Sequence, residues 1–250
     1  MKLLLDIGNT HTHLGLANER RVIRQRNIAT EDWRRGGALA EVRAFVGRAR
    51  IEGTALCSVV PWATKAAGRI LHKAFGLRPL ELNYKNVRGI GVDYPKPASI
   101  GADRLANAVA ARVHYGAPAV VVDFGTAVTF DVVDRKGNYI GGIIAPGLSV
   151  MTDYLHEKTA LLPAIQIRDI KAVVGKSTEQ AMLIGAVHGY RGLVRELVSE
   201  LKRELKAQKL PVIATGGYAH LIAAALPEIK AVEPLLTLEG LRLVAEGNRV

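Results

Sequence analysis

Apolar and polar positions alternate along several short segments, and the first of these predict a β-hairpin. Residues 2–7 and residues 12–17 are two mainly apolar segments, and a tight turn of small and polar residues, Asp6 to Thr10, joins them. A period of two is the pattern of a half-buried strand, and Gly and Asn favour a turn between two strands. The alternating residues 21–28 follow a second turn and predict another extended segment.

The same hairpin design occurs again 117 positions later. Residues 119–123 and 128–133 are apolar runs around a turn of Gly and Thr, and a carboxylate again stands near the end of the first run. The positions that match are Leu5 with Val122, Asp6 with Asp123, Gly8 with Gly125, and Thr12 with Thr129. Two copies of one pattern predict an internal duplication.

Helical patterns lie between and after these hairpins. Apolar residues recur every three to four positions, which is the spacing of one buried helix face. Helices are predicted over residues 30–48 (weakened at Gly36-Gly37), 61–75, 102–115, 148–159, 177–206, 219–225 and 237–246. Ser177 and Gln180 have the spacing of a capping box at the start of the fifth. Further strands are predicted over residues 54–60, 77–82, 139–144 and 211–214, and residues 84–99 are predicted to be an ordered loop.

A break at residues 114–118, His-Tyr-Gly-Ala-Pro, separates the two copies. We therefore predict an α/β protein with two domains, residues 1–115 and 116–250, each built around one hairpin. A chain of 250 residues is long enough for either one large core or two smaller ones.

Composition indicates a globular protein of a reducing compartment. Hydrophobic residues make up 49% and charged residues 23%, which are ordinary globular values. Cys57 is the single cysteine, so no disulfide forms within the chain, and its apolar surroundings predict a buried strand residue. Asp6 interrupts the first apolar run, which excludes a signal-peptide core, and no apolar stretch reaches the ~18 residues of a membrane span. These features predict a cytoplasmic protein without membrane contact.

The net charge is +11, which raises the question of an anionic partner. The basic residues are scattered, and aromatic residues make up only 5% of the chain, so a platform for stacking bases is poorly supported. Solvated basic faces are the favoured interpretation over nucleic-acid binding.

The two hairpin turns carry the candidate chemistry. Gly lets a ligand approach the backbone, and main-chain N–H groups with Thr hydroxyls suit phosphate oxygens. The carboxylate before the Gly suits a hydrated metal ion or a water. One such turn is equally an Asx-stabilised hairpin with no ligand. Two copies at matching strand ends favour a clamp for ATP.

The sequence resembles the type III pantothenate kinase family. The motifs that carry the resemblance are DIGNT at 6–10, GADR at 101–104, DFGTAVT at 123–129, GGIIAPG at 141–147 and TGG at 215–217, in the family's order along nearly the whole chain. The resemblance implies two ribonuclease-H-like domains of the actin-like superfamily of acetate and sugar kinases, Hsp70 and actin. It also implies a homodimer that uses ATP and Mg²⁺ to phosphorylate pantothenate, the first step of coenzyme A synthesis.

Transferred by motif, the family's roles assign residues to ATP, to pantothenate and to a cation. The ATP phosphates would be held by Asp6, Ile7, Gly8, Asn9, Thr10, His11, Thr12, His13 and Thr126. Pantothenate would contact Tyr94, Gly101, Ala102, Asp103, Arg104 and Thr178, with Asp103 as the catalytic base. Asp123 would carry a monovalent cation, K⁺ or NH₄⁺.

The chemistry of Asp103 and Arg104 agrees with these roles. Phosphoryl transfer needs a carboxylate to accept the proton of the attacking hydroxyl, and a helix N-terminus with an Arg fork suits the carboxylate of pantothenate. Without the resemblance, Asp103 is an acid in a first helical turn, and Arg104 a surface or interdomain ion pair. Thr178 is also explained by the capping box and Tyr94 by packing of its Pro-rich loop. The turn at 215–217 resembles the adenosine side of the family but is also an ordinary loop.

Some alternatives remain open on the sequence. His11 and His13 depart from the family pattern and lie on one strand face, where a zinc pair is conceivable, although no third ligand is near in sequence. A sugar or acetate kinase of the same superfamily is a second enzymatic interpretation. A non-catalytic regulator with a basic binding surface is a third, and the presence of Asp6, Asp103 and Asp123 together argues against it.

Overall fold

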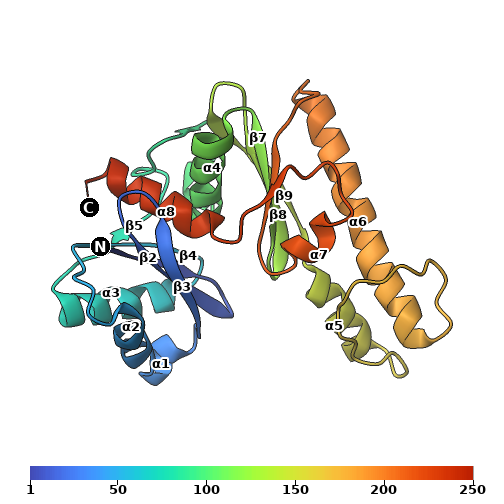
Figure 1. Cartoon of the computed structure of the whole chain (residues 1–250), viewed down its shortest axis with the longest axis horizontal. Coiled ribbons are helices and arrows are strands. Elements are labelled where there is room, and N and C mark those ends of the chain that lie inside the picture. The colour runs from blue at the N-terminus through green and yellow to red at the C-terminus, as the bar shows by residue number, and fades with distance from the viewer. Residues whose placement is uncertain (250) are drawn as a thin grey trace. The chain divides into compact units, whose positions relative to one another are not determined.

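The computed structural model describes residues 1–249, and Val250, the last residue of the predicted second domain, lies outside them. The chain divides into two compact units (Figure 1). The first comprises Met1–Gly116, Gly137–Tyr139 and the chain from Leu235 onward, and the second comprises Ala117–Lys136 and Ile140–Pro234. A single cut at residue 115/116 therefore does not describe the division, because the C-terminal helix α8 (Leu236–Gly247) packs on α4 (Ala102–Tyr115) of the first unit.

The first unit is built on a five-stranded sheet. The strands are β1 (Lys2–Ile7), β2 (His11–Ala17), β3 (Val22–Ala29), β4 (Gly53–Ser58) and β5 (Leu80–Glu81), in the order β3-β2-β1-β4-β5. β2 is antiparallel to β1, and β4 is parallel to it. A further short strand, β6 (Gly91–Val92), pairs in parallel with Asn138 and Tyr139 of the same unit.

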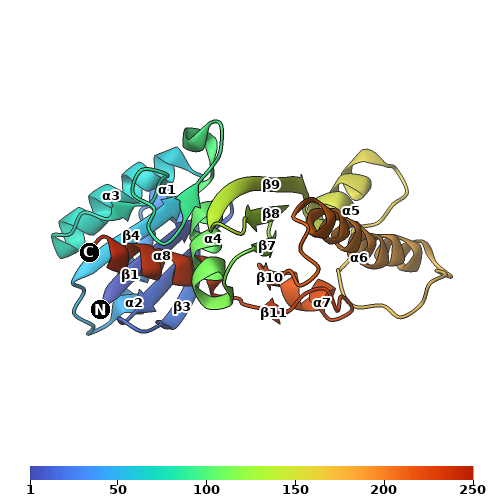
Figure 2. The same ribbon diagram turned by 90° about the horizontal axis from the view of Figure 1, so that it is seen from above.

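Alternation along β1 explains how this sheet is covered. Leu3, Leu5 and Ile7 are fully buried against helices α1 (Asp32–Arg35), α2 (Ala38–Val46) and α3 (Pro61–Phe75). The opposite face meets α8, since an added Cβ at Gly15 would touch Leu238 at 3.2 Å. Helices α4 and α8 lie side by side in Figures 1 and 2.

The second unit repeats the strand order of the first. Its strands are β7 (Ala119–Phe124), β8 (Ala127–Val133), β9 (Asn138–Pro146), β10 (Val212–Thr215) and β11 (Ala231–Val232). The first two residues of β9 belong to the first unit. Starting at β9, the order is β9-β8-β7-β10-β11, which matches β3-β2-β1-β4-β5 position by position. β8 is antiparallel and β10 parallel to β7, as β2 and β4 are to β1. The predicted duplication is thus visible in topology. The helices of this unit are α5 (Leu148–Lys158), α6 (Thr178–Glu204) and α7 (Ala219–Ala223).

The elements agree with the sequence predictions except where glycine or long-range packing intervenes. The helix predicted over residues 30–48 is wrong as one element, because Gly36 takes a left-handed conformation with φ 86° and separates α1 from α2. The capping box at α6 is confirmed: the Ser177 hydroxyl accepts the N–H of Gln180 at 3.2 Å, and Gln180 accepts the N–H of Lys176. Two two-residue strands, β6 and β11, are absent from the sequence prediction because they are too short to show a period, and β6 corrects the prediction of a loop over residues 84–99.

Among residues 1–249, no helix has the length and apolar character that crossing a membrane requires.

Candidate active site

The first hairpin turn presents its polar tip to solvent. The N–H of Gly8 donates to the carbonyl of His11 at 3.0 Å, which closes the turn. Asn9, Thr10 and His11 are exposed at this tip. Ile7 and Thr12 have buried side chains, so of these two residues only the main chain faces the turn. The exposed tip combines backbone N–H groups and hydroxyls, the donors that phosphate oxygens require.

A buried set of hydrogen bonds supports this hairpin from below. The Thr12 and Thr30 hydroxyls lie 3.1 Å apart, and the indole N–H of Trp33 donates to Thr12 Oγ1 at 3.0 Å. The Thr30 hydroxyl also donates to the carbonyl of Gly8 at 2.7 Å. Buried polar groups that satisfy one another make a rigid support, so the turn is fixed before any ligand arrives.

Asp6 stands at the base of the hairpin and contacts Cys57. The Cys57 thiol donates to Asp6 Oδ1 at 3.4 Å, across the β1–β4 pair in which Asp6 and Cys57 are partners. The burial predicted for Cys57 is confirmed, since it is fully inaccessible. Burial, and then the negative charges of Asp6 and Asp103, raise the pKa of this thiol, so it stays protonated as a donor to Asp6.

Asp103 lies in the first turn of α4, where Gly101 precedes the helix. Asp103 Oδ1 accepts the N–H of Arg104 at 2.9 Å. A Cβ at Gly101 would lie 2.5 Å from the same oxygen, so glycine leaves room for the carboxylate. Burial raises the pKa of Asp103 above its usual value, against the opposing effect of the Arg104 N–H and charge. A carboxyl group with a raised pKa is better suited to accept a proton than an ordinary surface aspartate.

Tyr139 connects two of the predicted pantothenate residues. Its ring lies 5.9 Å from the Arg104 guanidinium and 6.2 Å from the Tyr94 ring, which it meets edge-on. Tyr139 is buried, whereas Tyr94 is exposed. The N–H of Asp93 donates to the carbonyl of Tyr139 at 3.0 Å, which attaches the loop of Tyr94 to β9. The structure therefore brings Tyr94, Asp103 and Arg104 into one region of the first unit.

The second hairpin has a different support. Thr126 is exposed at its tip, and the carbonyl of Thr126 accepts the N–H of Gly147 at 3.0 Å. Asp123 is half-buried and pairs with Thr215 across β7 and β10. Gly216 follows with φ 90°, and a Cβ there would lie 2.6 Å from Asp123 Oδ1. The turn at 215–217 thus encloses Asp123 within the second unit.

Thr178 and the two histidines of the first hairpin remain to be placed. Thr178 is exposed at the first residue of α6, next to its cap Ser177. His11 is exposed, and His13 Nδ1 lies 2.7 Å from Asn27 Oδ1. Within residues 1–249 no group of three His, Cys, Asp or Glu side chains could hold a metal ion, so the zinc alternative has no third protein ligand.

Sequence reasoning missed four residues that the structure places at these sites. In the sequence, Tyr139 has the pattern of an ordinary strand residue, and Thr30 only begins the first predicted helix. The sequence predicts burial for Cys57 but no contact with Asp6, and Gly216 has the pattern of an ordinary loop residue. Each of the four contacts arises between segments far apart in sequence, so no local pattern signals it.

Comparison with known proteins gives one consistent result. A profile described as "Type III pantothenate kinase" matches residues 2–200. The chain is 46% identical over 247 residues to the type III pantothenate kinase of Akkermansia muciniphila, with 98% of each chain covered. It is 44% identical over 245 residues to that of Methylacidiphilum infernorum, covering 98% of this chain and 88% of the relative.

Solved structures extend the likeness to the fold. A putative Baf family transcriptional activator from Campylobacter jejuni matches with a TM-score of 0.60 at 18% identity, covering 99% of this chain and 98% of that one. A putative 2-dehydro-3-deoxygalactonokinase from Sinorhizobium meliloti also gives 0.60, at 14% identity and 99% coverage of both chains. The predicted fold class, an actin-like α/β fold shared with sugar kinases, is confirmed.

Proposed function

The chain belongs to the type III pantothenate kinase family, and from that premise we propose that Asp103 is the general base of its reaction. The protein is an ATP-dependent kinase that phosphorylates pantothenate in the first step of coenzyme A synthesis. The sugar kinase, acetate kinase and non-catalytic interpretations are thereby set aside. One observation carries the proposal: the carboxyl group of Asp103 is half-buried beside Arg104, and this burial raises its pKa.

In the proposed reaction, Asp103 accepts the proton of the pantothenate hydroxyl as its oxygen attacks the γ-phosphorus of ATP. The bond between that phosphorus and the β–γ bridging oxygen breaks, and ADP leaves with 4'-phosphopantothenate as the product. Arg104 offers a planar fork to the substrate carboxylate, and Tyr139 holds both Arg104 and Tyr94 in place. Gly101 and Ala102 contribute main chain at the start of α4. Thr178 is retained as a further pantothenate contact on the ground of its motif position.

For ATP, we assign the phosphates to the tip of the first hairpin and to Thr126 of the second. Asn9, Thr10 and His11 supply exposed donors, and Gly8 supplies the close backbone approach. Asp6 and His13 flank the turn as partners in the β1–β2 register. Ile7 and Thr12 act through their main chain, because the Thr12 hydroxyl is already engaged by Thr30 and Trp33.

Asp123 fits a monovalent cation better than a protein-held Mg²⁺. It offers one carboxylate, and among residues 1–249 no second and third acidic ligand gather with it. A single carboxylate with main-chain oxygens suits a weakly held K⁺ or NH₄⁺, whereas Mg²⁺ is commonly carried by the nucleotide phosphates. When bound, the cation would neutralise negative charge on the phosphates.

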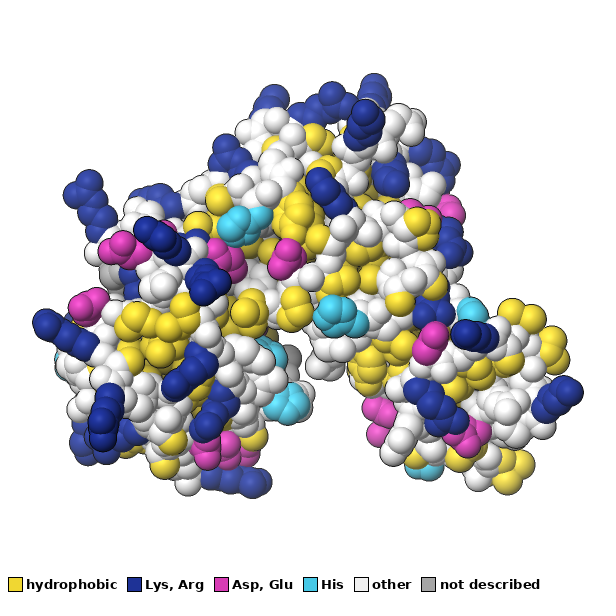
Figure 3. Space-filling model, in the orientation of Figure 1, with side chains coloured by type: hydrophobic (Ala, Val, Ile, Leu, Met, Phe, Trp, Pro, Cys, Tyr) yellow, Lys and Arg dark blue, Asp and Glu magenta, His cyan; other side chains and the backbone are white. Residues whose placement is uncertain are grey.

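Exposed apolar side chains in the second unit support the homodimer. Tyr154 and Leu155 on α5 and Leu161, Val173 and Val174 after it are all exposed, Leu161 by 90%. Figure 3 shows apolar side chains on the surface of this part of the second unit. Such exposure is unusual for a monomer and typical of an interface. We expect a dimer by light scattering, and a Leu161→Asp/Tyr154→Asp variant that remains dimeric would contradict this surface. A cytoplasmic location is part of the same proposal.

The reaction is tested by Asp103→Asn with ATP, Mg²⁺, K⁺ and pantothenate. We expect kcat to fall by about 10²–10⁴-fold, the usual contribution of a general base, with pantothenate affinity changed by less than a few fold. Asp93→Asn is the control, because Asp93 is an exposed acid in the neighbouring loop. If wild-type protein, folded and dimeric, forms no phosphopantothenate, the function itself is contradicted. If the wild-type protein is active and Asp103→Asn keeps the full rate, the function stands and the role of Asp103 as the base is contradicted.

A further inference from the structure

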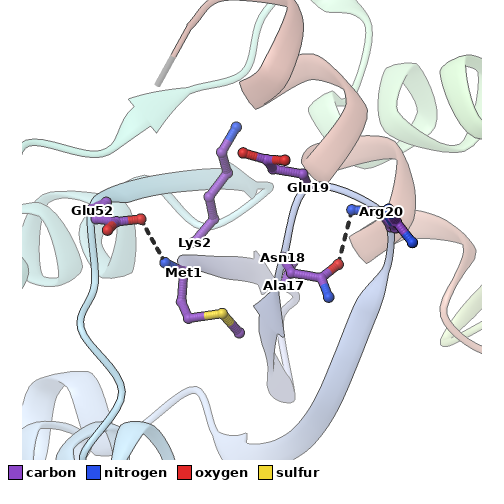
Figure 4. A pocket seen from close by; sticks show the side chains of 7 residues that line it. All are labelled: Met1, Lys2, Ala17, Asn18, Glu19, Arg20 and Glu52. Carbon is purple, nitrogen blue, oxygen red and sulfur yellow. Dashed lines mark hydrogen bonds and ion pairs between the residues drawn. The ribbon is translucent and has the colours of Figure 1, made fainter.

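Two hollows on the first unit differ in how their charges are satisfied. The smaller one, of about 390 Å³, lies beside the N-terminus (Figure 4). There the Met1 ammonium pairs with Glu52 at 2.8 Å, and Asn18 Oδ1 accepts the N–H of Arg20 at 2.8 Å. The hollow has three cationic groups, the Met1 ammonium, Lys2 and Arg20, against two acids, Glu19 and Glu52, so its excess is one positive charge. Its positive excess is smaller than that of the second hollow, where Lys65, Arg69 and Arg78 face one acid.

The larger hollow is a groove of about 770 Å³ along α3, and its charges are not balanced. Lys65, Arg69 and His72 line one wall. They are spaced i, i+4 and i+7, which places them on one face of the helix. Arg78, from the segment that leads into β5, lines the groove as well, and Glu81 is its one acid. We name this hollow the α3 groove.

The Lys and Arg side chains of the α3 groove have no ion-pair partner in the described part of the chain. Across residues 1–249, neither Lys65, Arg69 nor Arg78 forms an ion pair with an acidic side chain. All three are exposed. Like charges one helical turn apart repel each other, and an anion between them removes that repulsion. The groove is therefore set up to attract negative charge.

The size and spacing of the groove narrow the class of anion. Its volume lies within the roughly 300–1,000 Å³ of small-molecule sites. Lys65 and His72 are seven residues apart, which is about 10 Å along a helix. A chain of two or three phosphates matches this length and offers separate oxygens to successive basic side chains. Arg guanidinium groups bind such oxygens in a bidentate manner.

We propose that the α3 groove binds a small ligand that carries a chain of phosphate groups, at a site separate from the catalytic one. The groove contains none of the residues assigned to ATP, pantothenate or the cation. One end lies close to the ATP hairpin, because Ser58 of the groove is the strand partner of Ile7.

The test uses inorganic tripolyphosphate as the probe, with calorimetry of the whole protein near 0.15 M salt. The groove variant is Lys65→Ala/Arg69→Ala. The matched control is Arg48→Ala/Lys73→Ala, which removes the same charge from exposed positions of the same unit that do not line the groove. Thermal unfolding is measured in parallel and should change little, because all four side chains are exposed.

We expect the groove variant to lose affinity for tripolyphosphate by about tenfold or more, while the control loses less than twofold. The KM for ATP should be unchanged in both variants. Equal losses in the two variants would reduce the effect to overall charge, and failure of the wild-type protein to bind would remove the site. A rise in the KM for ATP in the groove variant would mean that the groove is part of the ATP site and not a separate site. Each of these three results overturns the proposal, and none bears on the catalytic role of Asp103.

Discussion

The two hairpins share a sequence design and a strand order but are supported in different ways. Thr12 of the first hairpin is buried and hydrogen-bonded to Thr30 and Trp33. Thr129, its counterpart in the second, is half-buried and makes no hydrogen bond through its side chain within residues 1–249. Conversely, Asp123 is enclosed by the Gly216 turn, whereas Asp6 receives the thiol of Cys57. Duplication thus preserved the backbone while the side-chain environments diverged.

This difference suggests a division of labour between the two copies. A turn fixed from below by buried hydrogen bonds keeps its N–H groups oriented without a ligand, which suits recognition of phosphate. A carboxylate at a strand end beside a close backbone turn suits a weakly held cation. On this interpretation the first hairpin sets ATP affinity and the second sets the dependence on K⁺.

The largest effect on kinetics should come from replacing the carboxylates of Asp6 and Asp123 in two separate variants. Asp6→Asn is expected to lower kcat/KM for ATP by about 100-fold, comparable to the loss of one preorganised group, without changing the K⁺ concentration for half-maximal activity. Asp123→Asn is expected to raise that K⁺ concentration by about tenfold or more. Steady-state titrations of ATP and K⁺ measure both. If the two variants respond alike to both titrations, the division of labour is wrong.

A somewhat smaller effect is expected at Gly216. Gly216→Ala places a Cβ at positive φ and against the backbone of Phe124, so the free energy of unfolding should fall by about 2 kcal/mol. K⁺ activation should weaken together with it, because Asp123 Oδ1 lies in the path of the same Cβ. Gly217→Ala is the matched control, since its Cβ would meet nothing within 4 Å. Equal stability of the two variants in chemical denaturation would contradict the close packing of Gly216 against Phe124 and Asp123.

The smallest effect concerns the support of the first hairpin. Thr12→Val leaves Thr30 and Trp33 with a lost partner, and we expect a loss of about 1–2 kcal/mol in stability together with weaker ATP binding. Thr129→Val at the equivalent place should stay within about 0.5 kcal/mol. Denaturant unfolding of both variants tests the contrast. A larger loss for Thr129→Val would reverse it.

The hairpins and the α6 cap could be predicted from sequence because each rests on neighbouring residues. Ser177 and Gln180 are three apart, and each turn lies between two apolar runs. The return of α8 to the first unit could not be predicted, because it depends on close packing: a Cβ at Gly240 would overlap the backbone of Ala106, 134 positions earlier. The same holds for Thr12 with Thr30 and for Gly216 with Asp123. Motif resemblance placed the candidate residues in sequence, and only the fold shows which of them share a unit.

The raised pKa of Asp103 has a consequence for stability as well as for catalysis. A carboxyl group whose pKa is higher in the folded state than in the unfolded state stabilises the fold when protonated, and that stability is lost as the pH rises through the folded pKa. At neutral pH the ionised Asp103 therefore lowers the free energy of unfolding. Asp103→Asn should keep or slightly raise the melting temperature while removing activity, which separates a functional group from a structural one.

The most direct test of the account is the pH dependence of kcat for wild-type protein and Asp103→Asn. If Asp103 is the base, wild-type activity falls as the pH drops through a pKa above the ordinary aspartate value of about 3.9, because the protonated carboxyl cannot accept a proton. The variant should show a low rate without that acid limb. An Asp103→Asn enzyme that keeps both the wild-type rate and the acid limb would contradict the assignment of the base.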